Sequence, residues 1–249
     1  MVNVTEKSNF NQNLVERILI LEGLDLISSK NIVVDKSTLS IKDLKIVTVF
    51  SLDHVQQAIK CCQSIRAHPE LTKTKIIAYI FDDMHQDVLH IYNSLCSDVE
   101  IRHLKKLFEK YPDYVRKPKE YRFKHIITAD TLKVEKLILY VDASISFRNS
   151  RGIQFEILIN DFLKNNTIDA ALFLPTSHSV FSVTHPKMYE FLPADTEKLK
   201  HLEMYMAGIT LWVSTQKAKN LLHTIVSCGL EQECMAPNGS LQECLPHVT

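Results

Sequence analysis

Short runs of β-branched and other apolar residues recur along the chain, with a segment of helical periodicity between one run and the next. The clearest runs are residues 45–51, 75–81, 137–141 and 169–174. Their length and continuous apolar character are typical of strands that are buried on both faces of a sheet. Strands that alternate with helices predict an α/β fold of the three-layer, Rossmann-like kind, with one mostly parallel sheet, helices on both faces and right-handed crossovers.

The remaining segments complete this expected architecture. Weaker strand patterns cover residues 99–104, at an edge of the sheet, and 204–213, and residues 179–183 are a candidate for further pairing. Apolar residues at helical spacing predict helices, including 11–29 with Leu14 and Ile18 on the inner face, 120–132, and one with Ile153, Ile157, Leu158 and Phe162 inside. We expect an N-terminal helix and linker over 1–44, an α/β domain over 45–230, and an irregular C-terminal tail over 231–249.

Charge and hydropathy exclude two classes of partner. Lysine plus arginine and aspartate plus glutamate both number 29, so the formal net charge is zero. This balance argues against a nucleic-acid binder that works by bulk phosphate neutralisation. No apolar run has the length of a membrane span, and the polar residues 1–9 do not resemble a signal peptide.

Common nucleotide and hydrolase motifs are also absent from the sequence. The five glycines form no Gly-x-Gly-x-x-Gly or Walker loop, and there is no Gly-x-Ser-x-Gly elbow. The six cysteines include no Cys-x-x-Cys pair, which argues against a zinc site.

Cys61 and Cys62 lie in a helical pattern and are expected in or near the core. Three others cluster in the tail, where a disulfide would form in an oxidising compartment: Cys228, Cys234 and Cys244. Asn-x-Ser/Thr sequons begin at Asn3, Asn165 and Asn238 and matter only in such a compartment.

Asp142 is the most informative polar residue because it directly follows the buried run 137–141. Ligands of open α/β sheets bind outside the carboxyl ends of the strands, so an acid there is placed to ligate a metal or a ribose. The small residues Ala143 and Ser144 would let a phosphate approach the backbone. The alternative is an aspartate that caps the turn leaving the sheet.

Several segments together resemble a GT-A type glycosyltransferase, a nucleotide-diphospho-sugar transferase-like fold. They include the strand end at 140–147 (Tyr-Val-Asp-Ala-Ser-Ile-Ser-Phe), the Lys-bearing helix at 120–127, and 205–212 (Tyr-Met-Ala-Gly-Ile-Thr-Leu-Trp). With 184–193 and 234–240, they are similar to an uncharacterised metazoan family of this fold that is abundant in nematodes. The resemblance covers residues 45–240, and the family pattern continues beyond Thr249, which favours a shortened chain.

The resemblance implies a donor site at the strand ends. Phe50, Ser51 and Asp82 would then receive the nucleotide base. Asp142 would hold Mn²⁺ or Mg²⁺ against the diphosphate. The family's second acid is replaced here by Ser144, so another ligand would be needed. The histidines that could supply it, or that could equally be surface residues, are His178, His185 and His201.

The resemblance also implies an acceptor side. Ala207 and Gly208 match the segment that faces the donor sugar and the acceptor, which would be a glycan, protein or lipid. Glu203, with Asp195 behind it, is the candidate general base, although both residues could equally be solvated surface acids. The expected function is sugar transfer from a nucleotide-sugar donor in the Golgi or another secretory lumen. The alternative is a non-catalytic protein that keeps the fold for binding or assembly, and the lack of a visible leader keeps a cytoplasmic location open.

Overall fold

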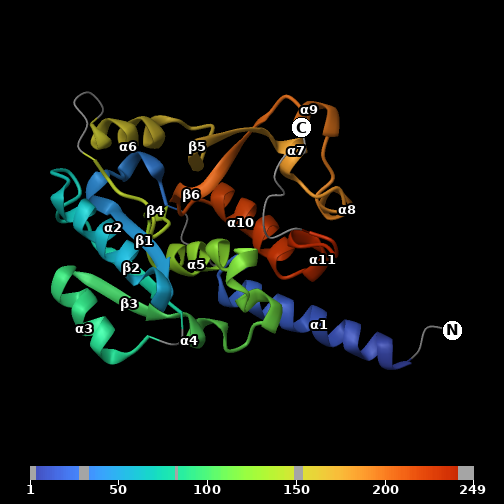
Figure 1. Cartoon of the computed structure of the whole chain (residues 1–249). Coiled ribbons are helices and arrows are strands. Elements are labelled where there is room, and N and C mark those ends of the chain that lie inside the picture. The colour runs from blue at the N-terminus through green and yellow to red at the C-terminus, as the bar shows by residue number, and fades with distance from the viewer. Residues whose placement is uncertain (1–3, 28–33, 82–83, 149–153, 241–249) are drawn as a thin grey trace, which may run out of the picture.

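A six-stranded sheet forms the centre of the computed structural model, which describes residues 4–27, 34–81, 84–148 and 154–240 (Figure 1). The strands are β1 (Leu44–Phe50), β2 (Ile76–Ile80), β3 (Val99–His103), β4 (Leu137–Val141), β5 (Ala170–Ser179) and β6 (Glu203–Val213). Their order across the sheet is β3-β2-β1-β4-β6-β5. Strands β1 to β4 pair in parallel, whereas β6 is antiparallel to both β4 and β5. The predicted mostly parallel α/β sheet is therefore confirmed.

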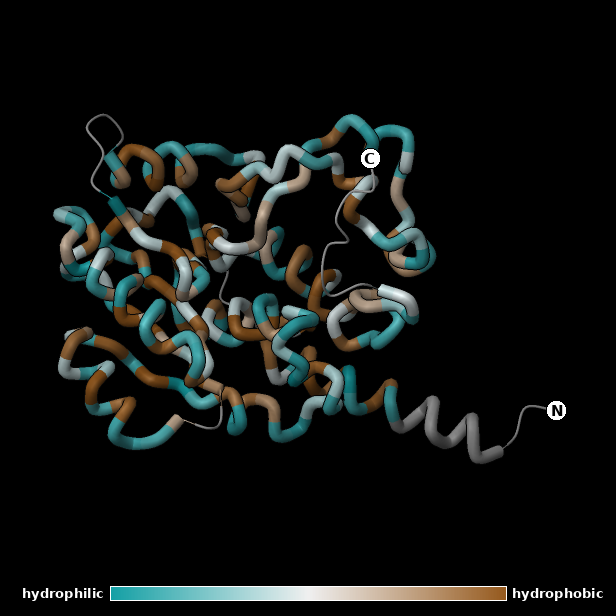
Figure 2. The backbone as a smooth tube through the Cα atoms, viewed as in Figure 1, coloured by the Kyte–Doolittle hydropathy of each residue, from teal (hydrophilic) through white to brown (hydrophobic). Residues whose placement is uncertain are grey.

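Helices cover both faces of this sheet. The longer ones are α1 (Val4–Gly23), α2 (Val55–Ala67), α3 (Gln86–Leu95), α5 (Phe123–Leu132), α6 (Phe155–Lys164) and α10 (Gln216–Gly229). Buried residues of α1, α5, α10 and the short α4 (Leu104–Phe108) pack on one face, and those of α2, α3 and α6 pack on the other. Every residue of β2 and β4 is buried as a result. Figure 2 shows the hydrophobic residues concentrated along these central strands.

The far end of the β5–β6 pair is less covered than the centre of the sheet. Register shifts interrupt its pairing between Leu172 and Leu174 and between Pro175 and Ser179. Short helices follow there: α7 (Val180–Val183), α8 (Met188–Phe191) and α9 (Thr196–Leu199). The suggested pairing of residues 179–183 is therefore wrong beyond Ser179, because the chain turns into α7, which begins where the Ser179 side chain accepts from the Ser182 amide.

Two disulfides connect helices that are neighbours along the chain. Cys62 of α2 pairs with Cys96, the residue that directly follows α3. Cys228 of α10 pairs with Cys234 of α11 (Gln232–Met235), so the tail predicted to be irregular begins with a short helix that a disulfide joins to α10. Cys61 is buried, as expected from the sequence. Cys244 lies outside the described residues.

Helix faces differ from the sequence prediction in two places. Leu14 and Ile18 are 48% and 41% exposed, and α1 ends at Gly23 rather than at residue 29. Ile20 and Leu21, near the C-terminal end of α1, pack in the core, and so do Leu24 and Leu26 in the turn that follows the helix. In α6, Ile157 is exposed and Ile159 is buried, while Ile153 lies outside the described residues.

Among the residues that the structure describes, no helix combines the length and apolarity needed to cross a membrane. The division of the chain at residues 44/45 and 230/231 stays a prediction.

Candidate functional site

A cavity of about 670 Å³ opens at the carboxyl edge of β1 and β4. Its walls come from the segments that follow these strands, from the 3₁₀ helix η5 (Pro118–Glu120) and from the start of α5. Ends of parallel strands leave unpaired backbone and diverging loops, which is why open α/β sheets bind ligands there. The cavity is therefore the place where the predicted donor site should lie.

Asp142 is held in this cavity by three contacts. Its backbone amide donates to the carbonyl of Gly208 over 2.8 Å, which continues the antiparallel β4–β6 ladder by one residue. The hydroxyl of Tyr140 donates to Oδ1 over 2.6 Å. The ammonium of Lys124 donates to Oδ2 over 2.8 Å. Both carboxylate oxygens thus accept a hydrogen bond, and the Asp142 side chain is 30% exposed to solvent.

Tyr140 and Asp142 meet because residues two apart on a strand point to the same face. The pKa of Tyr140 is raised well above its usual value by burial and then by the charge of Asp142. The Tyr140 hydroxyl therefore keeps its proton and remains a hydrogen-bond donor to the carboxylate.

Lys124 reaches Asp142 from the first turn of α5, which packs on the same face of the sheet. The Lys124 side chain is only 11% exposed, and its Nζ lies 4.7 Å from the ring centre of Tyr121 and 5.6 Å from that of Tyr140. Tyr121 is 56% exposed and adopts a left-handed backbone with φ of 55°, an uncommon conformation for a bulky residue. This backbone directs the chain from η5 into α5 and leaves an aromatic ring at the cavity wall.

Gly208 faces the Asp142 carboxylate from the neighbouring strand. A Cβ atom built on Gly208 would lie 3.1 Å from Oδ2 of Asp142, closer than most such contacts. A glycine here is thus explained by the close approach of the carboxylate rather than by backbone torsion.

Three polar residues form a network at the rim near the end of β1. Ser51 Oγ donates to Asp53 Oδ1 and lies 3.0 Å from Nδ1 of His54, which in turn lies 2.9 Å from the same Asp53 oxygen. Hydrogen bonds from Ser51 and then from His54 lower the pKa of Asp53. The cavity therefore carries an ionised carboxylate and an imidazole beside its opening.

The structure brings together only part of the residue set predicted from the sequence. Phe50, Ser51, Asp142 and Ser144 line the cavity, Gly208 touches Asp142, and half-buried Ala207 precedes Gly208 on β6. Asp82 lies outside the described residues.

The predicted bases and histidines lie elsewhere. Asp195 caps α9 by accepting from the Lys198 amide, and Glu203 begins β6 as an exposed residue. Neither these two acids nor the three candidate histidines belong to the described lining of the cavity: His178, His185 and His201.

The described donors do not fit a divalent metal as they stand. No group of three or more His, Cys, Asp or Glu side chains that could hold a metal ion occurs among the described residues. Asp142 already neutralises Lys124, and a cation bound to the same carboxylate would lie within a few ångströms of this ammonium. Repulsion at ~4 Å is about 4 kcal/mol per unit of metal charge at an effective dielectric of ~20. Ser144 adds only a weak neutral ligand at the position where the resembled family has a second acid.

Sequence reasoning missed the partners of Asp142. The Tyr-x-Asp spacing of residues 140 and 142 was a usable signal, because period-two alternation puts them on one face. Lys124 gave no such signal, since its contact with Asp142 depends on how α5 packs against β4.

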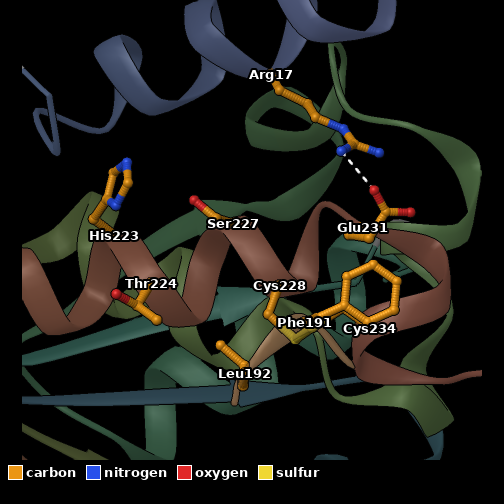
Figure 3. A pocket seen from close by; sticks show the side chains of 9 residues that line it. All are labelled: Arg17, Phe191, Leu192, His223, Thr224, Ser227, Cys228, Glu231 and Cys234. Carbon is orange, nitrogen blue, oxygen red and sulfur yellow. Dashed lines mark hydrogen bonds and ion pairs between the residues drawn. A yellow bond between two sulfur atoms is a disulfide. The ribbon is translucent and has the colours of Figure 1, made fainter. Parts of the chain in front are cut away.

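A second, smaller cavity of about 360 Å³ lies between α1, α8, α10 and α11 (Figure 3). There Arg17 of α1 forms a 2.7 Å ion pair with Glu231, beside the Cys228–Cys234 disulfide. This cavity shares no described lining residue with the Asp142 cavity. Its ion pair and disulfide fasten the C-terminal end of α10 to α1 and α11.

Several solved structures with a similar arrangement of strands and helices are glycosyltransferases. The mannosyltransferase Ktr4p from S. cerevisiae aligns with a TM-score of 0.50 and 12% identity, over 88% of this chain and 71% of Ktr4p. The chain has the GT-A glycosyltransferase fold. Core-mannan synthase A from Aspergillus fumigatus, in its Mn/GDP form, aligns with a TM-score of 0.47 and 8% identity over 86% of this chain and 75% of that enzyme.

A galactosyltransferase, LgtC, solved with donor and acceptor sugar analogues, gives a TM-score of 0.45 at 14% identity. The alignment covers 76% of this chain, which spans 64% of the length of LgtC. At these identities the likeness concerns the fold alone. A family model described as "Protein of unknown function (DUF1647)" matches residues 6–129. A search of curated protein sequences found no match.

Proposed function

We propose that this chain takes a nucleotide-sugar donor in the Asp142 cavity and transfers the sugar to an acceptor hydroxyl. The observation that carries the proposal is the position of Asp142, which follows β4 at the carboxyl edge of a GT-A sheet, lines the cavity and lies against Gly208 of the neighbouring strand. Phe50 and Ser51 would receive the nucleoside, together with Asp82 as predicted from the sequence. Ser144 would lie near the diphosphate, and Ala207 and Gly208 near the sugar.

The acceptor, a glycan, a protein or a lipid, would enter from the opening of the cavity. Glu203 and Asp195 remain the bases predicted from the sequence. Asp53 and His54 lie at the cavity itself and are the nearer described groups that could accept the proton of an attacking hydroxyl.

Metal assistance was the predicted form of this reaction. The similar Aspergillus enzyme was solved with manganese and GDP. In this chain the positive charge of Lys124 beside Asp142 opposes the binding of a divalent cation to this carboxylate.

We place the protein in an oxidising lumen of the secretory pathway, such as the Golgi. Two disulfides among the described cysteines support this location. The sequons at Asn165 and Asn238 are exposed and would be accessible there. Expression in cultured cells, with removal of N-linked glycans and a mobility assay, tests the location: an unshifted, fully reduced protein would contradict it.

Ligand binding tests the proposed function directly. We expect UDP or GDP, or one of their sugar conjugates, to raise the melting temperature, because a ligand that binds only the folded state stabilises it. Ser144→Trp places a large ring at an exposed position of the cavity wall and should remove this effect. Ser146→Trp is the matched control, since Ser146 is exposed in the same loop but does not belong to the described lining. Wild-type protein that binds none of these nucleotides, with or without Mn²⁺, would overturn the proposal.

The second candidate is a non-catalytic GT-A protein that only binds or assembles. It is favoured by the position of Asp195, which caps a helix outside the cavity. Release of free UDP or GDP from a bound donor in the presence of wild-type protein, and not of Ser144→Trp, would exclude this candidate. Binding without any turnover would support it.

A further inference from the structure

We propose that the ammonium of Lys124, rather than a divalent cation, binds the diphosphate of the donor, and that Asp142 positions this lysine. The inference rests on the proposed function, since it names the group that recognises the donor. Its basis is the hydrogen-bonded Lys124–Asp142–Tyr140 cluster, in which Lys124 and Asp142 line the cavity and the buried Tyr140 supports Asp142 from behind.

The ammonium of Lys124 has hydrogen-bonding capacity left for a ligand. A lysine ammonium carries three N–H donors. Among the described residues, Oδ2 of Asp142 is the hydrogen-bond acceptor that Nζ reaches. Two N–H groups therefore remain, and Lys124 belongs to the lining of the cavity. Phosphate oxygens are the acceptors that a lysine point charge commonly binds.

Burial reduces the solvent screening around the ammonium of Lys124, although Asp142 offsets part of its charge. The Lys124 side chain is 11% exposed and lies against the rings of Tyr121 and Tyr140. A charge removed from bulk water interacts more strongly with an incoming anion, because less solvent screens it. The flexible lysine stem is also fixed by these contacts, so little side-chain entropy remains to be lost when a diphosphate binds.

Asp142 acts here through Lys124. Its Oδ1 accepts from the buried Tyr140 hydroxyl, and its Oδ2 accepts from Lys124, so the carboxylate is oriented from one side and orients the ammonium on the other. The pair also cancels its own charge, so a diphosphate meets an ammonium and a compensated carboxylate instead of a free negative charge. Asp142 is therefore a positioning residue in this account.

The test is isothermal titration of the full chain with UDP and with GDP, once in EDTA and once in Mn²⁺. We expect the affinity of the wild type to be the same in both buffers within about threefold. Lys124→Met should weaken binding at least tenfold in both buffers. Asp142→Asn should weaken it by only a few-fold, with no change in the metal response. Lys105→Met removes an exposed lysine of α4 outside the cavity and is the matched control.

A metal at Asp142 predicts the reverse pattern. Binding would then be lost in EDTA, lost in Asp142→Asn, and retained in Lys124→Met when Mn²⁺ is present. That result would overturn the role of Lys124 and leave the proposed function intact. Wild-type protein that binds neither UDP nor GDP in either buffer would instead overturn the proposed function. The EDTA comparison on the wild type needs no variant, so loss of binding in EDTA overturns the proposal even where Lys124→Met does not fold.

Discussion

A Cβ atom on residue 208 would lie 3.1 Å from Oδ2 of Asp142. The carboxylate that follows β4 therefore occupies space that only a glycine at this position of β6 leaves free. The same two residues are joined through the backbone, where the Asp142 amide donates to the Gly208 carbonyl over 2.8 Å. Any side chain at position 208 must therefore act on the carboxylate that holds Lys124.

Gly208→Ala should displace the Asp142 carboxylate by a few tenths of an ångström and weaken its contact with Lys124. Glycine in a strand costs about 0.5–1 kcal/mol relative to alanine, so the free energy of unfolding should change by less than about 1 kcal/mol. We expect nucleotide binding to fall by several-fold while stability is kept. Urea unfolding and titration with UDP and GDP measure the two effects. Equal affinity in wild type and variant would show that the carboxylate position is irrelevant to binding.

Val141→Asp should destabilise the protein by several kcal/mol. Val141 is fully buried in the last position of β4, and an unpaired carboxylate there must lose its solvation or take up a proton. Val134→Asp is the control, because Val134 is 68% exposed and should change stability by about 0.5 kcal/mol or less. Chemical denaturation compares them, and similar midpoints for both variants would contradict the burial of β4.

Arg122→Met should cost about 3–5 kcal/mol, as expected when one partner of a buried ionic network is removed. Arg122 is 1% exposed, pairs with Glu120, and donates to three carbonyls at the C-terminal end of α10 and just beyond it, those of Gly229, Glu231 and Gln232. Its loss leaves these acceptors without their donor at the junction of α5 with the C-terminal segment. The exposed Arg148 offers a control, and a melting temperature of Arg122→Met equal to that of Arg148→Met would argue against the network.

His125 should make the protein less stable as pH falls from about 6.5 to about 4. Burial, and then the nearby charge of Lys124, lowers the pKa of His125 to about 4 in the folded state, whereas an unfolded histidine titrates near 6.5. Between these two pH values the unfolded chain binds more protons than the folded one. The free energy of unfolding therefore decreases as the pH is lowered, by at most about 3 kcal/mol. His125 as a residue is half-buried, and its contact with solvent reduces this figure.

His125→Gln should flatten this part of the curve of stability against pH, measured by urea unfolding at a series of pH values. His90→Gln replaces an exposed histidine of α3 and should leave the slope as it is. Parallel slopes in the wild type and His125→Gln would show that another group is responsible.

Local pattern was sufficient for the central strands and for the position of Asp142. Runs such as residues 137–141 are apolar on every residue, and only a strand covered on both faces buries all of them. Where the run stops, the chain must leave the sheet, so an acid at position 142 had to lie at the edge. Helix faces were harder: Leu14 and Ile18 have the same spacing as core residues but lie on a part of α1 that does not meet the core.

The sequence by itself thus determined the α/β class, the buried strands and the acid at the end of β4, because each depends on residues adjacent in the chain. The tertiary structure alone decided what that acid does. Lys124 and Asp142 are 18 residues apart and meet only because α5 folds back over β4, and Gly208 meets Asp142 only because β6 pairs antiparallel to β4. Contacts between segments depend on how whole elements pack, and packing is settled by the shape and burial of many side chains together rather than by any local pattern.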